Sequence, residues 1–204
     1  NNSIWLGNDP EPSGTASYNV AVGTNAYTAA TSGNDNVAIG YGALAAGDTV
    51  SSSIAIGRDA LLAFNGNYYH NIGIGHGALQ SITTSSTNVA VGGYAAALIN
   101  SGDNTALGHM ALTTCVSGNE NVAVGAQAGE KITSSGNTMV GWNAGEENTS
   151  GTHNTAVGYM AMSTGVTTGS NNVAIGRSAL NSLTNGPGNV AIGWNAMAAN
   201  TTGD

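Results

Sequence analysis

The stretch Asn172-Val173-Ala174-Ile175-Gly176 decides the fold, because close variants of it recur along the whole chain. The regular copies start at nearly even intervals, at Asn19, Asn36, Ser53, Asn71, Asn88, Asn104, Asn121, Asn137, Asn154, Asn172 and Asn189. A degenerate first copy starts at Ser3. The repeat therefore predicts a single domain over residues 1–204, with a degenerate first coil at 3–18 and regular coils at 19–204.

Each copy, numbered from its first residue, reads as a short strand followed by a corner. Position five is Gly in every copy, which predicts positive φ or a lack of room for a Cβ atom. Positions two and four hold Val, Ile, Thr or Leu, and we expect them to share the core face of the strand. Position eight is Ala in all eleven regular copies, position nine is often Leu or Met, and the remainder is typical of turns.

A strand of about five residues cannot bury itself, but coils stacked about 4.8 Å apart let each strand pair with its equivalent in the next coil. The sequence therefore predicts an all-β fold, a parallel β-solenoid (β-roll or β-helix) of about twelve 17-residue coils. The Asn side chains at position one are expected to bond along the stack as a structural ladder. Its members include Asn36, Asn88, Asn121, Asn172 and Asn189.

Composition excludes several classes of function. Three Lys and Arg against eleven Asp and Glu give a net charge of −8, which disfavours nucleic acid as a partner. No stretch approaches the roughly 20 apolar residues that cross a bilayer, so we expect no membrane insertion. Cys115 is the only cysteine, and we interpret it as a small apolar core residue.

The thin cross-section of such a coil also predicts assembly. One coil contains few large aliphatic side chains to bury against the entropy of ordering its backbone. Flat Ala-rich strips at positions three and eight would bury more surface if identical chains packed side by side. We therefore expect a homotrimer with its axis along the rod.

The stretch Asn36-Val37-Ala38-Ile39-Gly40 resembles the head repeats of YadA-type trimeric autotransporter adhesins. The longer stretch from Asn154 to Met162 is similar to repeat regions in bacteriophage tail fibres and related bacterial surface fibres. The longer period of this chain favours the fibre group. The resemblance implies an extracellular trimeric β-roll or β-helix, in a virion tail fibre or a cell-surface fibre, that carries or forms a binding surface for a host.

Sequence patterns typical of catalytic, cofactor or metal sites are sparse. No carboxylate pair, Ser/His/Asp arrangement or phosphate-binding Gly loop stands out, so we expect neither an enzyme nor a cofactor. Asp35, Asp103 and Glu120 each precede a repeat Asn, but a solvated turn explains them better than calcium, and we expect no metal. An ice-binding solenoid is disfavoured, because Thr105, Thr138 and Thr155 fall at position two, which is expected to face inward.

Position six, directly after the corner Gly, holds Trp142, Tyr159, Arg177 and Trp194 in four successive coils. Aromatic faces with polar neighbours suit sugar rings, so this row, flanked by Asn143 and Asn195, is a candidate carbohydrate-contacting surface. The rings could instead stack on one another or fill a groove between subunits. The two functions left open are an adhesive fibre segment that contacts a cell-surface glycan and a purely structural shaft or spacer.

Overall fold

The structure is a computed structural model that describes residues 2–7, 14–66 and 70–202. Within this part of the chain, twelve strands of three residues form one parallel sheet in chain order. They are β1 (Ile4–Leu6), β2 (Val20–Val22), β3 (Val37–Ile39), β4 (Ile54–Ile56), β5 (Ile72–Ile74), β6 (Val89–Val91), β7 (Thr105–Leu107), β8 (Val122–Val124), β9 (Thr138–Val140), β10 (Thr155–Val157), β11 (Val173–Ile175) and β12 (Val190–Ile192).

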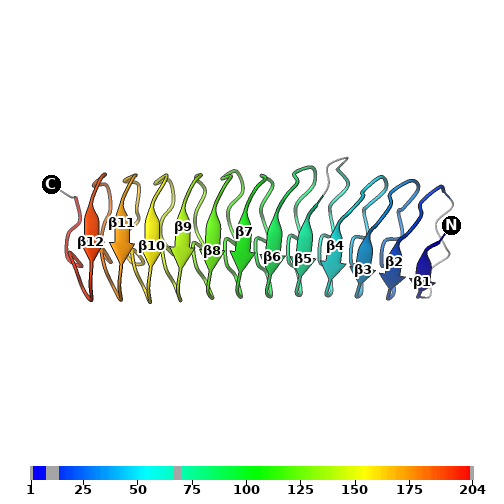
Figure 1. The fold of residues 1–204 in the computed structure, drawn as a ribbon, viewed down its shortest axis with the longest axis horizontal. Coiled ribbons are helices and arrows are strands. Elements are labelled where there is room, and N and C mark those ends of the chain that lie inside the picture. The colour runs from blue at the N-terminus through cyan, green and yellow to red at the C-terminus, as the bar shows by residue number, and fades with distance from the viewer. Residues whose placement is uncertain (1, 8–13, 67–69, 203–204) are drawn as a thin grey trace.

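The strands lie side by side along an elongated rod, with one coil of chain between each strand and the next (Figure 1). Equivalent residues pair in every case, as Val173 does with Val190 and Ala174 with Ala191. The small differences in length between coils leave this register intact, because the turns absorb them. The predicted all-β parallel solenoid is confirmed. Part of the degenerate first coil, residues 8–13, lies outside the described residues.

The predicted core face of the strands is wrong. The middle residue of each strand from β2 to β12 is buried, whereas its two neighbours are half-buried or exposed. Positions two and four therefore face outward, and this includes Thr105, Thr138 and Thr155. The Ala strips at positions three and eight, expected to be available for assembly, are inside the coil.

The opposite wall of the coil explains this orientation. Position nine contributes fully buried side chains such as Leu79 and Leu112, and position twelve contributes Phe64, Ile82 and Ile132. These large groups fill the narrow interior, so only a small side chain fits on the strand that faces them. Ala meets this requirement, and the larger β-branched residues point outward.

In each of the regular coils, left-handed residues at positions seven and nine bring position nine into the interior. Gln127 at position seven has φ 58°, and Leu112 at position nine has φ 51°. Turn hydrogen bonds accompany them, as where the N–H of Ala128 donates to the Gly125 carbonyl at 3.3 Å. A left-handed non-Gly residue costs about 1–2 kcal/mol. Two such residues cost about 2–4 kcal/mol, and burial of one Leu side chain contributes about 1.5–3 kcal/mol, which offsets much of that cost.

The ladder of position-one side chains lies along one inner edge of the rod. The Asn104 side-chain oxygen accepts the backbone N–H of Asn121 at 3.0 Å and its side-chain amide at 3.1 Å. The Asn121 amide also donates across its coil to the Ser134 carbonyl, at 2.8 Å. In the same way, the side-chain oxygen of the preceding Asn accepts the backbone N–H of Ser53, Asn88, Asn104, Asn137, Asn154, Asn172 and Asn189. The ladder therefore satisfies buried polar groups that the sheet leaves without partners.

Candidate functional site

The position-six residues form a column along the corners that follow the strands, at the lower edge of Figure 1. Backbone hydrogen bonds fix their order, because the N–H of position seven donates to the carbonyl of position six in the preceding coil. Asn143 donates in this way to Ala126 at 3.1 Å, and Asn195 donates to Arg177 at 2.9 Å. Side chains at position six therefore leave the rod one above another, at the spacing of the coils.

Three of the four predicted position-six residues are in direct contact. The rings of Trp142 and Tyr159 stack with centroids 4.9 Å apart and an interplanar angle of 20°. The Arg177 guanidinium lies 5.5 Å from the centroid of the Tyr159 ring. All three side chains are exposed, as is Trp194 in the last coil. The structure thus builds a stacked group from side chains of three successive coils.

This stacking limits how the column could hold a sugar. Trp142 and Arg177 belong to the coils on either side of Tyr159, so they cover both faces of its ring. The rings therefore present their edges to solvent, and a sugar cannot lie flat on Tyr159. Face-on stacking, which the sequence suggested for the whole row, is restricted to ring faces that no neighbour covers.

The two flanking asparagines differ in accessibility. Both have left-handed backbone, with φ 53°, a conformation that Asn tolerates better than most residues. Asn143 is buried, and its side-chain amide donates to Glu146 Oε2 at 2.6 Å. Asn195 is exposed. Only Asn195 therefore presents an accessible side chain, whereas Asn143 supports its own turn and orients Glu146.

A second aromatic contact lies nearer the N-terminus. The rings of His76 and Tyr94 lie 4.8 Å apart at an angle of 50°, with Tyr94 Oη 3.5 Å from His76 Nε2. His76 is at position six, but its partner is at position seven, beside Gly93. A search confined to one repeat position misses this pair. Comparing adjacent positions in neighbouring coils would have found it.

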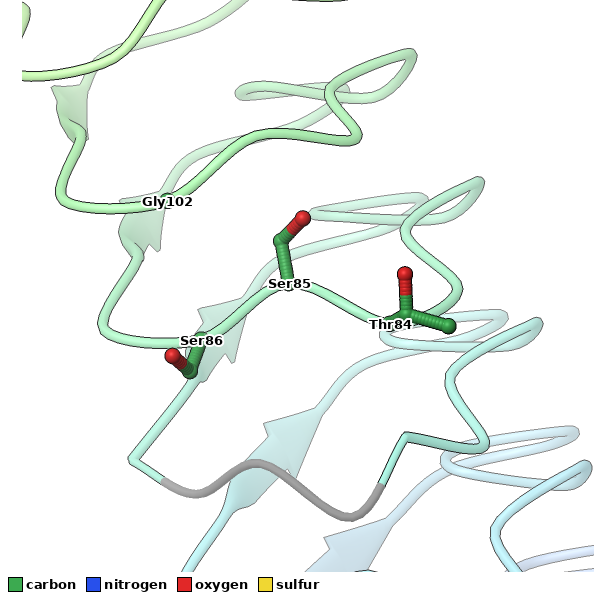
Figure 2. A pocket seen from close by; sticks show the side chains of 4 residues that line it. All are labelled: Thr84, Ser85, Ser86 and Gly102. Carbon is green, nitrogen blue, oxygen red and sulfur yellow. The ribbon is translucent and has the colours of Figure 1, made fainter.

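A shallow depression of about 300 Å³ lies between two neighbouring turns. Thr84, Ser85 and Ser86 line it from one coil and Gly102 from the next, as Figure 2 shows. The Ser85 hydroxyl already donates to the Asn100 carbonyl at 2.8 Å. The lining has no acid, base or thiol, so it offers hydroxyl groups for hydrogen bonding but no group for catalysis.

Titratable groups in the described part of the chain are dispersed over many coils. Across the residues that the structure describes, no three His, Cys, Asp or Glu side chains gather as metal ligands. Burial raises the pKa of the Cys115 thiol to about 11, which keeps it protonated and unreactive at neutral pH. A hydrogen bond to Glu147 raises the pKa of Lys131, and the two side chains form an ion pair.

No helix in the described part of the chain is long and apolar enough to span a bilayer. Comparisons of the chain with family models, with curated proteins and with solved structures found no match.

Proposed function

We propose that this chain is a structural and adhesive segment of an extracellular trimeric fibre. In this proposal the segment contacts a glycan on a host or cell surface, and it is not an enzyme. The observation that carries the proposal is the outward face of the twelve-strand sheet. It is largely apolar from one end of the rod to the other, which is unusual for a surface meant to remain in water.

The size of this face supports self-association. Twelve strands about 4.8 Å apart and about 10 Å long give a flat area of roughly 600 Å². That is at the upper limit of the apolar patches found on soluble monomers. Ile39, Val91, Leu107 and Ile175 are each more than one-third exposed on it. Parallel copies around an axis along the rod would bring the same residues together at every level.

The exposed column at position six supports the adhesive part of the proposal. Trp142 and Trp194 combine large apolar rings with a polar N–H, a combination that suits sugar hydroxyls and C–H groups. The test is the double substitution Trp142→Ala and Trp194→Ala, assayed on a glycan array and by sedimentation. We expect glycan binding to be lost while the oligomer and its melting temperature stay nearly unchanged, because both side chains are exposed.

Two results of this experiment would oppose the adhesive role of the column. Dissociation of the double variant would show that the column is a subunit interface. Undiminished glycan binding would place the binding surface elsewhere.

A purely structural shaft is the second candidate, favoured by the covered faces of Tyr159. Wild-type protein that binds no glycan on the array would support this candidate. Ice binding, by contrast, lacks a threonine array. Thr occupies only three outward positions of the twelve strands, Thr105, Thr138 and Thr155, although these side chains do face outward.

A further inference from the structure

The column at position six is interrupted by a small residue beside its most stacked part. Going along the rod, His109, Ala126 and Trp142 occupy position six in three successive coils. The N–H of Gln127 donates to the His109 carbonyl at 2.9 Å, and that of Asn143 donates to the Ala126 carbonyl at 3.1 Å. Ala126 therefore lies at the level where a ring would continue the stack from Trp142 toward His109.

The spacing of the coils leaves room along the rod for one ring at this interruption. His109 and Trp142 are two coils apart, which is about 9.6 Å along the rod. A ring at the level of Ala126 would lie about 4.8 Å along the rod from the levels of His109 and Trp142, close to the 4.9 Å between the centroids of Trp142 and Tyr159. Among the described residues, Tyr159 supplies the one ring contact of Trp142, so no other ring covers the face toward Ala126.

The coil of Ala126 and the coil of Trp142 each carry a polar pair in their turns. Gln127 donates to Glu130 Oε2 at 2.9 Å, and Asn143 donates to Glu146 Oε2 at 2.6 Å. In each coil the carboxamide directly follows the position-six residue. The two half-exposed carboxylates can accept hydrogen bonds from hydroxyl groups, and they repel anions. Lys131, in the same turn as Glu130, is already paired with Glu147.

We propose that the interruption over Ala126, between His109 and Trp142, binds one neutral sugar ring in its pyranose form. The ring inserts edge-on, places one face of C–H groups against Trp142, and directs hydroxyls toward Glu130 and Glu146. This inference rests on the proposed adhesive function and names the subsite within the column. Binding at this subsite differs from binding along the whole row of position-six residues, because Tyr159 supports Trp142 by stacking on it and does not contact the sugar.

Filling the interruption tests the subsite. Ala126→Trp would complete the column with a side chain that position six already accepts at Trp142 and Trp194. Thr24→Trp is the matched control, because it adds the same indole to an exposed position six far along the rod. Saturation-transfer NMR and calorimetric titration would use the methyl β-glycosides of glucose, galactose and N-acetylglucosamine as probes. Circular dichroism and thermal melting would check that each variant folds.

We expect wild type and Thr24→Trp to bind at least one probe alike, and Ala126→Trp to bind it at least about tenfold more weakly. Unchanged binding by Ala126→Trp overturns the subsite. If Trp142→Ala/Trp194→Ala then loses glycan binding, the proposed function stands and only the subsite fails. If wild type binds neither these probes nor any arrayed glycan, both are wrong. Ala126→Tyr gives a second blocking variant should Ala126→Trp fail to fold.

Discussion

At the corner after each strand from β2 to β11, a single glycine meets two constraints that a side chain would violate. Gly125 has φ 132°, outside the range of ordinary L-residues, and a Cβ atom there would lie 2.5 Å from the Gly141 carbonyl oxygen. The sequence offered positive φ and close approach as alternative explanations. Both hold, because the left-handed corner also brings successive coils into backbone contact.

Two adjacent glycines in one coil allow the cost of these constraints in stability to be measured. Gly92 has φ 137°, and a Cβ atom there would collide with the Gly108 carbonyl, whereas Gly93 has no neighbouring atom within 4 Å. We expect Gly92→Ala to destabilise by about 2–5 kcal/mol, and Gly93→Ala to be neutral or stabilising by up to about 1 kcal/mol. Urea unfolding followed by circular dichroism compares the two. Equal losses would contradict the assignment of these constraints to position five.

Within one coil, the side chains compensate one another in size. In the coil of β9 the strand carries Met139 where most coils have Ala, and position nine is Gly145 where many have Leu. A Cβ atom on Gly145 would overlap the Met139 sulfur atom, so the long side chain occupies the space that position nine fills elsewhere. The coil thus keeps its interior volume, because here the strand supplies the large side chain and position nine the small residue.

This exchange predicts strong coupling between the two positions. Met139→Ala should cost about 2–5 kcal/mol by leaving a cavity, and Gly145→Leu should be destabilising through overlap with Met139. The double variant restores the pattern of the other coils, where Leu112 adopts φ 51° at position nine, and should recover most of both losses. A double-mutant cycle from thermal or urea unfolding gives the coupling energy. Simple additivity would show that the two side chains do not share one space.

At the scale of the whole molecule, stacking produces a surface that no single coil has. The strands β1 to β12 lie side by side along the rod (Figure 1), and their outward side chains form one largely apolar face. The side of the rod formed by the turns instead carries hydroxyl and amide side chains bonded between coils, as Thr164 is to Asn181 at 2.6 Å. The two sides therefore differ in what they can bind, and across the described residues the sheet offers a continuous apolar surface to a second copy.

The sheet face makes a specific prediction about assembly. Three chains of 20.1 kDa give a particle of about 60 kDa. Val91→Lys combined with Val122→Lys would place charges on the face, and we expect sedimentation to shift toward the monomer. Val116→Lys is the control, because Val116 is 52% exposed but lies in the turn, away from the strands. A wild-type monomer, or a trimer that survives the double substitution, would contradict assembly through this face.

The sequence by itself determined the repeat, the strand positions, the parallel solenoid and the corner glycine. Each of these follows from periodicity, because a feature that recurs at a nearly constant interval must occupy the same place in every coil. The position-one asparagines were recognisable for the same reason. Stacked equivalent amides, such as those of Asn104 and Asn121, have each other as nearest partners. The outward row at position six also followed from register alone.

Only the tertiary structure decided which face of the strand is buried. In a strand such as Val-Ala-Ile all three residues are apolar, so alternation alone leaves the inward side open. The choice depends on the space left by Leu79, Phe64 and their equivalents across the coil, and on the left-handed turns that bring position nine inward. Ring stacking between Trp142 and Tyr159 was decided in the same way. These properties come from distances between side chains, which the order of residues along the chain does not contain.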